Sequence, residues 1–218
     1  MLVSPGSILL IDKPIGISSF DVIRRLRTKT GIRKMGHAGT LDPMASGLLI
    51  VGVGTEGTEQ LERFIKLDKT YKVTAKLGVR TDTGDREGEV VEEVDTVGEI
   101  REDDVRGVCK HLTGTNELPV PIYSAVKVGG EPLYKKARRG EKVEPPVRAM
   151  TVYRLELATM RKEDGRVFLD LTMDVASGVY VRSVVEAIGR ELGVPAMTVA
   201  LRRTRIGEYS VDDAEQLD

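Results

Sequence analysis

The sequence predicts an α+β fold with a mixed, mostly antiparallel sheet flanked by helices, and three observations support this prediction. Apolar and polar residues alternate over 71–79 and again over 167–175, as they do in half-buried strands. A turn at 81–88 leads from the first of these segments into another strand, which indicates a hairpin. Strands and helices are mixed without a strict β-α-β order. Because the sequence contains no internal repeat or linker, we expect a single domain over 1–218.

The first elements expected are a strand and a helix. An apolar run at 7–11 predicts a short buried strand. The helix after it begins at Ser18 or Ser19, either of which can cap it, and ends near Gly31. The residues that we expect on the core face of this helix are Phe20, Ile23 and Leu26.

The middle of the chain predicts two further helices and a long irregular stretch. The apolar run 48–51 predicts a strand, and Thr58 is expected to cap a helix that carries Leu61, Phe64 and Ile65. An apolar stripe at 103–112 predicts another helix. Residues 113–148 are rich in Pro, Gly and basic residues, and loops of this length are usually functional or mobile. The remaining elements expected are helices at 133–139 and from about Val181, and strands at 152–157, 167–175 and 198–206.

Composition limits the function classes. The chain has 218 residues, of which 40% are hydrophobic and 31% charged, and it has no apolar run that could span a bilayer. Its N-terminal residues lack the basic and apolar regions of a secretory signal. The single cysteine, Cys109, lies on the apolar stripe at 103–112 and is expected to fill the core. Together these features predict a soluble, cytoplasmic monomer.

Charge is segregated along the chain, although the formal net charge is only −1. One basic cluster lies between Arg24 and Lys34 and has a single acid nearby, Asp21. A second cluster holds Lys127, Lys135, Lys136, Arg138, Arg139, Lys142 and Arg148. This segregation favours a protein with one face suited to phosphates. Two ordinary solvated helix faces would give the same pattern, so the clusters alone do not decide between a phosphate-binding face and solvated helices.

The most informative stretch is Gly36-His37-Ala38-Gly39-Thr40-Leu41-Asp42-Pro43. Two glycines and a proline disfavour a helix or strand interior, so a tight turn is predicted. The turn leads into the apolar strand at 48–51, which would anchor Asp42 to a rigid element, as catalytic side chains often are. The alternative is an aspartate that caps its own turn.

Other chemistries are poorly supplied by the residues. His37 and His111 are the only histidines, and with one cysteine they do not make a zinc ligand set. The sequence has no Gly-x-Ser-x-Gly turn, no Walker-type phosphate loop and no dinucleotide fingerprint. A cofactor-free reaction that uses a carboxylate is what the residues allow, with Asp42 as the candidate.

Two further segments carry candidate side chains. Tyr180 and Arg182 would share a face if the backbone is extended there. A buried Arg182 near Asp42 would keep that carboxylate ionised, whereas a surface ion pair is an equally good interpretation of Arg182. Tyr71 opens the alternating strand and either packs in the core or stacks on a base flipped out of its helix.

Seven segments match, in order, the motifs of one family. They are 13–19, 36–43, 69–71, 80–85, 123–127, 178–182 and 201–203. Together they resemble the bacterial tRNA pseudouridine-55 synthases of the TruB family, from Leu9 to about Tyr209. The resemblance implies the pseudouridine synthase fold and an isomerase that converts the T-loop uridine of tRNA, at position 55, to pseudouridine without a cofactor or metal.

The resemblance also implies roles for the matching residues. Asp42 would be the nucleophile, Arg182 would pair with it, and Tyr71 would stack on the flipped uracil and could take part in proton removal from C5. The other substrate contacts implied are His37, which would help the base to leave its stack, Tyr180, Leu201 and Lys13. Residues 113–148 would form the basic thumb loop of the family. The implied RNA contacts are Lys127, Lys135, Arg138 and Arg139 in this loop, and Arg202.

Bacterial members usually carry a small C-terminal RNA-binding module of the PUA type, which this chain is expected to lack. The partner implied is tRNA, through its T-stem-loop, with no membrane and no obligate protein partner. Two alternatives stay open at this point. One is an RNA-binding or RNA-folding protein of the same fold with weak or lost catalysis, and the other is a pseudouridine synthase that acts on another RNA.

Overall fold

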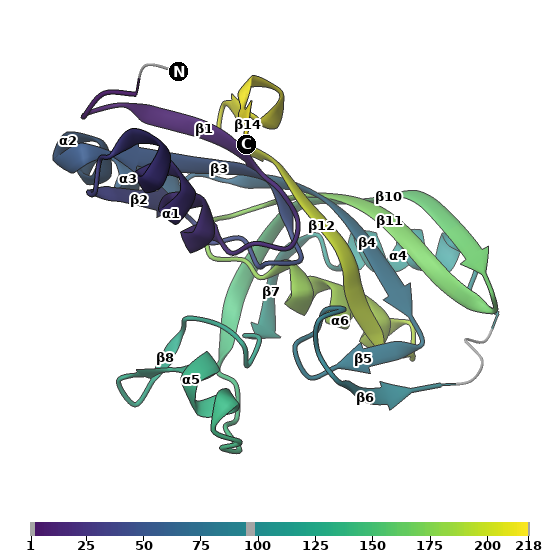
Figure 1. Cartoon of the computed structure of the whole chain (residues 1–218). Coiled ribbons are helices and arrows are strands. Elements are labelled where there is room, and N and C mark those ends of the chain that lie inside the picture. Colours follow the sequence, from purple (N-terminus) through teal and green to yellow (C-terminus); the bar gives the residue numbers. More distant parts are fainter. Residues whose placement is uncertain (1–2, 95–98, 218) are drawn as a thin grey trace. The chain divides into compact units, whose positions relative to one another are not determined.

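The computed structural model describes residues 3–94 and 99–217, which form two compact units (Figure 1). The first unit holds Met1–Lys72 and Ala200–Asp218, and the second holds Val73–Val199. Two strands contribute residues to both units, namely β4 (Lys69–Leu77) and β12 (Ala196–Ile206). The single catalytic domain therefore stays a prediction. Among the described residues, no helix combines the length and the apolar character needed to cross a membrane.

The first unit is built on a sheet with the order β14-β1-β3-β12. Its strands are β14 (Glu215–Gln216), β1 (Ile8–Lys13), β3 (Ser46–Val53) and β12, with β2 (Met35–Ala38) on β3 and β13 (Tyr209–Ser210) on β12. β3 runs antiparallel to β1 and β2 and parallel to β12. The strands predicted around 7–11, 48–51 and 198–206 are confirmed.

The turn predicted from Gly36 is partly wrong, because residues 35–38 form strand β2. Gly36 lies opposite Gly52 of β3 in this pairing. A Cβ at Gly36 would lie 3.0 Å from the Cδ1 atom of Leu61, so glycine serves close packing here rather than a turn. Ladder hydrogen bonds to β3 outweigh the weak strand preference of glycine. Asp42 itself lies in a loop, as predicted.

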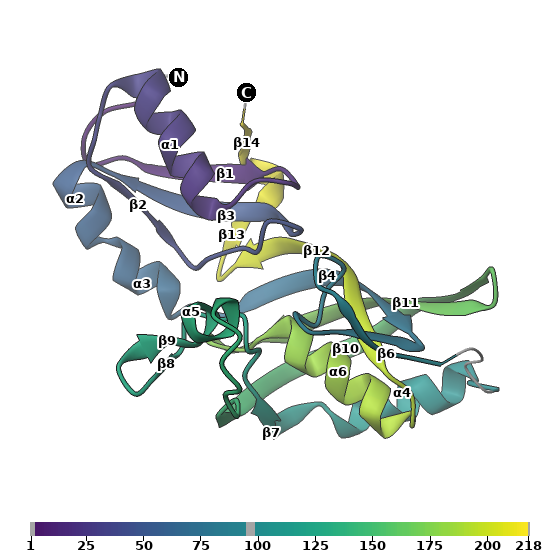
Figure 2. The same ribbon diagram turned by 60° about the horizontal axis from the view of Figure 1, so that its bottom comes forward.

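Helix α1 (Ser19–Thr30) covers one face of this sheet (Figure 2). Ser18 caps the helix, since its Oγ accepts a hydrogen bond from the backbone N–H of Asp21 at 3.1 Å, and Gly31 ends it with a φ of 73°. The buried residues of the helix pack with β1 and β3 and include Val22, Ile23 and Leu26. Phe20 was predicted in this core, which is wrong, since it is 54% exposed. At 3.6 residues per turn, Phe20 lies roughly 110° around the helix from the centre of the buried face.

Two short helices, α2 (Gly54–Glu59) and α3 (Leu61–Ile65), follow β3. Thr58 was predicted to cap a single helix, but it lies inside α2 and its hydroxyl donates to the carbonyl of Gly54 at 2.9 Å. α3 packs Leu61 and Phe64 against Leu48 and Ile50 of β3, while Leu49 and Val51 of the same strand face the cluster that contains α1. β3 is therefore buried on both faces, which explains its continuous apolar run.

The second unit contains the sheet order β4-β11-β10-β7. The strands are β11 (Arg166–Val175), β10 (Val147–Glu163) and β7 (Gly114–Pro119), with a separate hairpin of β5 (Val79–Thr81) and β6 (Val90–Glu93). Helices α4 (Glu102–His111) and α6 (Val181–Glu191) lie where the sequence predicted them. Most strand pairs in the two units are antiparallel, so the predicted α+β class is confirmed.

The stretch 113–148 is more regular than predicted. It begins with β7, which pairs antiparallel with β10, and continues into the small hairpin β8 (Lys127–Val128) and β9 (Glu131–Pro132). Helix α5 (Leu133–Arg138) follows and lies beside this hairpin (Figure 2). Local sequence missed β7 because its residues, Gly114-Thr-Asn-Glu-Leu-Pro119, have weak strand preference and are ordered by the edge of β10.

Candidate active site

The loop that carries Asp42 is held on both sides of this residue. Leu41 donates its N–H to the hydroxyl of Ser19 at 2.9 Å, and that hydroxyl donates to the Leu41 carbonyl at 3.1 Å. On the other side, the N–H of Gly16 donates to the carbonyl of Pro43 at 2.8 Å. Asp42 is half-buried between these anchors. Its carboxylate therefore projects from a backbone that is fixed to the start of α1 and to the segment before it.

Arg203 supports the same loop from inside the first unit. Its side chain is 1% exposed, its Nε donates to the carbonyl of Leu48 at 2.8 Å, and its Nη2 donates to the carbonyl of Gly39 at 3.0 Å. Sequence reasoning gave Arg203 no role. The signal was available, because Leu201 and Arg203 alternate with Arg202 along β12, which places both on the inward face.

His37 lies in β2, five residues before Asp42, and is half-buried. Its Nδ1 atom is buried and has no hydrogen-bond partner within the described part of the chain. Burial lowers the pKa of His37 below its usual value, and the positive charge of Arg203 lowers it further. His37 therefore presents a neutral ring at pH 7, which suits a contact with a base more than a contact with a phosphate.

The lowered pKa of His37 predicts a pH dependence of stability. Because the folded protein binds a proton at His37 less readily than the unfolded chain does, the free energy of unfolding should fall as the pH drops below about 6.5. We expect His37→Gln to show less of this fall in urea unfolding measured between pH 7.5 and pH 5. His111→Gln is the control, since His111 is exposed and bonds Glu191. If His37→Gln showed the same pH dependence as the parent chain, His37 would not be the source of the loss of stability at low pH.

Three other predicted site residues lie inside the first unit. Tyr71 and Leu201 are each 8% exposed. Lys13 is fully buried and its Nζ donates to the carbonyls of Pro14 at 2.9 Å and Ile17 at 2.7 Å. Lys13 thus holds the segment that precedes α1, and a direct contact of Lys13 with a substrate stays a prediction.

Arg182 is the centre of a buried polar cluster in the second unit. Its guanidinium donates to the carbonyls of Thr83 at 2.6 Å and Tyr123 at 3.1 Å, and lies 3.6 Å from the carboxylate of Asp85. The side chains of Arg182 and Asp85 are both 6% exposed. Arg182 is therefore a buried arginine, one of the two interpretations that the sequence allowed. Its pairing with Asp42 joins residues of different units and stays a prediction.

Asp85 is the functional candidate that sequence reasoning missed. It accepts hydrogen bonds from the hydroxyl of Thr83 at 2.8 Å and the N–H of Glu87 at 3.0 Å, in addition to its ion pair with Arg182. Only the motif 80–85 pointed to this residue. Tyr180 and Arg182 were expected to share a face if the backbone between them is extended. The backbone is not extended there, since Tyr180 is the N-cap of α6 and Arg182 is already helical.

The predicted RNA contacts differ in how far their charges are already paired. Lys127, Lys135 and Arg138 are exposed, and Arg138 stacks over the ring of Tyr134 at 5.5 Å. Arg139 is also exposed, but it bonds Glu131 at 2.6 Å and Glu141 at 2.7 Å. Arg202 forms a bidentate pair with Asp12 at 2.7 and 2.9 Å. RNA contacts by Arg139 and Arg202 therefore stay predictions. Each contact would require the arginine to exchange its carboxylate partner for a phosphate of the RNA.

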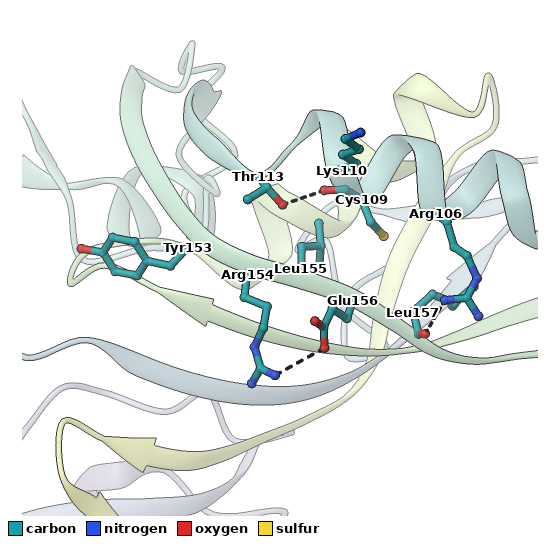
Figure 3. A pocket seen from close by; sticks show the side chains of 9 residues that line it. All are labelled: Arg106, Cys109, Lys110, Thr113, Tyr153, Arg154, Leu155, Glu156 and Leu157. Carbon is teal, nitrogen blue, oxygen red and sulfur yellow. Dashed lines mark hydrogen bonds and ion pairs between the residues drawn. The ribbon is translucent and has the colours of Figure 1, made fainter.

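A groove of about 380 Å³ lies between α4 and β10 (Figure 3). Two of its basic side chains are already paired, since Arg106 contacts Glu102 at 3.3 Å and Arg154 contacts Glu156 at 3.3 Å and Asp174 at 2.7 Å. Cys109 lines the groove and is 2% exposed, so its prediction as core filling is confirmed, and burial raises its pKa to about 11. Within residues 3–94 and 99–217, no cluster of His, Cys, Asp and Glu is placed to hold a metal ion.

Comparisons with known proteins identify the family of this chain. Residues 27–181 match the N-terminal domain of the TruB family pseudouridylate synthases. Proteins named tRNA pseudouridine synthase B are similar over 98% of this chain, with 41% identity in Mycobacterium sp. (strain KMS) and 42% in Nocardia farcinica (strain IFM 10152), where the matches cover 71% and 69% of those proteins.

A solved structure is similar as well. A chain in the crystal structure of a Cbf5-Nop10-Gar1 complex matches 96% of this chain with a TM-score of 0.70 and 26% identity, and the match covers 52% of that chain. The fold is therefore the pseudouridine synthase fold that the motifs implied. The family match over residues 27–181 and the identity above 40% over nearly the whole chain establish that this chain belongs to the TruB family of pseudouridylate synthases.

Proposed function

We propose that this enzyme isomerises the T-loop uridine of tRNA, at position 55, to pseudouridine. The observation that carries the proposal is the anchoring of Leu41 and Pro43, which fixes the backbone on both sides of Asp42. A nucleophile held in this way meets its target in one orientation, which is a large part of catalysis. The substrate is proposed from the relatives that are named tRNA pseudouridine synthase B.

The proposed reaction rearranges bonds within one nucleotide. The bond between N1 of uracil and C1' of ribose breaks, the uracil turns in the pocket, and a bond forms between C5 and C1'. C5 loses its proton and N1 gains one, so atoms and charge balance without a co-reactant. Asp42 acts as the nucleophile at C1' or at the base, or promotes a glycal intermediate, and Tyr71 lies against the ring and assists proton removal from C5.

The target uridine must leave its stack before it can react. Extrusion of a base costs a few kcal/mol. Stacking of the uracil on Tyr71 returns roughly 1–3 kcal/mol of this. His37, as a neutral ring, is proposed to occupy the place that the base leaves. Arg182 is proposed to pair with Asp42 and to keep it ionised, while Tyr180 and Leu201 line the pocket.

The basic side chains of 113–148 are proposed to contact phosphates and to position the RNA stem-loop. We expect Lys135→Ala to reduce the slope of log K against log salt by about 0.8, since one phosphate contact is lost. Arg139→Ala should change this slope less, because Glu131 and Glu141 already neutralise Arg139. Filter binding or anisotropy between 50 and 200 mM salt measures both. Equal slopes for the two variants would contradict the expectation that Lys135 contributes more to phosphate binding than Arg139.

The assay that tests the proposed function is incubation with an unmodified T-stem-loop RNA, followed by chemical mapping of pseudouridine. We expect product at the uridine that corresponds to position 55. Product on another RNA but not on this one would move the assignment to that RNA. Tight binding without product on any RNA would favour an RNA-folding protein. We further propose that the enzyme acts in the cytoplasm, as a monomer and with a single catalytic domain. Size-exclusion chromatography of the free and the RNA-bound chain tests the oligomeric state.

A further inference from the structure

Two exposed apolar side chains are next in sequence to residues that hold the Asp42 loop. Ile15 is 55% exposed and Phe20 is 54% exposed. Gly16, the neighbour of Ile15, bonds Pro43, and Ser19, the neighbour of Phe20, bonds Leu41. Each exposed side chain is thus one residue away from a hydrogen bond to a residue adjacent to Asp42. None of the core packing described for α1 requires Phe20.

The ring of Phe20 is held in place from one side. The guanidinium of Arg27 lies 5.6 Å from the centre of the ring, within the range of a cation–π contact. Arg27 is itself fixed, since its Nη2 donates to the carbonyl of Met35 in β2 at 3.2 Å. An aromatic ring that is backed by a fixed cation and half open to solvent is prepared for stacking with little loss of side-chain entropy.

The surroundings of Phe20 are positively charged. α1 exposes Arg24, Arg25 and Lys29, and its one acidic residue, Asp21, is paired with Arg24. A partner for this surface should therefore combine a flat, polarisable ring with negative charge. An unpaired nucleotide of RNA has both features, whereas an apolar protein surface has neither.

We propose that Phe20, backed by Arg27, is a stacking site for an unpaired base of the RNA loop next to the target uridine. The proposal rests on the proposed function for the identity of the ligand as RNA. It assigns to α1 a base contact, in addition to any phosphate contacts made by its arginines and lysine. Because Phe20 follows Ser19, which bonds the neighbour of Asp42 at Leu41, a base held there would also orient the adjacent nucleotide toward the carboxylate.

A single tryptophan can report on this site, because the chain has none. Phe20→Trp places the only indole at the proposed site, and Tyr153→Trp places it at a side chain of similar exposure, 53%, on β10 of the second unit. We expect the T-stem-loop RNA to quench the emission of Phe20→Trp at saturation and to leave that of Tyr153→Trp within a few per cent. Binding is followed independently by anisotropy of a labelled RNA.

Truncation gives a second readout. Phe20→Ala should weaken binding of the T-stem-loop roughly 10-fold, within the range for loss of one stacked base, and leave the salt slope unchanged. Tyr153→Ala should bind like the parent chain. Because Phe20 is exposed, the truncation should not unfold the protein, which circular dichroism checks.

Each outcome separates the inference from the proposed function. Quenching in Phe20→Trp without pseudouridine on any RNA would keep the stacking site and remove the proposed reaction. Pseudouridine formation with no quenching at saturating RNA would overturn the stacking site alone. A change of emission with protein concentration in the absence of RNA would identify the surface as a contact between copies of the chain and overturn the inference.

Discussion

Replacement of Asp42 by asparagine is expected to abolish pseudouridine formation, with a fall in single-turnover rate of at least about 10⁴-fold. The amide has nearly the same shape as the carboxylate but lacks its charge and nucleophilicity. The backbone around Asp42 should stay in place, because Ser19 and Gly16 hold the residues on both sides of it. Binding of the T-stem-loop should therefore stay within a few-fold of the parent chain.

Asp12→Asn is a matched control for this experiment. Asp12 is another carboxylate of the first unit, and it is buried and pairs with Arg202. We expect this variant to lose some stability and to keep a measurable rate of pseudouridine formation. Activity of Asp42→Asn equal to that of the parent chain would remove Asp42 from the mechanism.

Asp85→Ala should destabilise the protein by about 3–5 kcal/mol, the usual cost of leaving one member of a buried ion pair without its partner. The guanidinium of Arg182 would stay buried without this carboxylate, next to its carbonyl partners Thr83 and Tyr123. Because Arg182 would also lose the group that orients it, pseudouridine formation should fall by more than RNA binding does. Urea unfolding and single-turnover kinetics measure the two effects.

Two variants make the Asp85 experiment specific. Asp85→Asn keeps an oxygen that can accept from Thr83 and Glu87, so we expect a smaller loss of stability and a persisting defect in rate. Glu92→Ala breaks an exposed ion pair with Arg80 on the same hairpin and should cost less than about 1 kcal/mol. If Asp85→Ala cost no more than Glu92→Ala, the buried pair would have no special role.

Local patterns predicted much of the secondary structure. The alternation in β4 and β11, the apolar stripe of α4 and the cap and glycine that bound α1 are all written in short windows of sequence. The two mispredicted strand segments share one cause. β2 and β7 are strands of weak intrinsic preference that exist because they pair with the edges of β3 and β10, and such pairing is not visible within either segment.

The candidate site divides in the same way. Motif spacing pointed to Asp42, Tyr71 and Arg182, but it could not show what holds them. Arg203 bonds the carbonyl of Gly39, which is 164 positions away in the sequence. Asp85 pairs with Arg182, whose guanidinium bonds the carbonyl of Thr83, 99 positions away from Arg182. The exposure of Phe20 likewise follows from which face of α1 meets the sheet, which hydrophobic content does not reveal.

The sequence by itself determined the family, the strand and helix periods and the loop that carries the candidate nucleophile, because each depends on residue type and short spacing. Only the tertiary structure decided which arginines are buried supports and which are free to meet RNA, and which apolar residue faces solvent. These properties depend on partners that are distant in the chain, and a buried charge is stable only where such partners meet it.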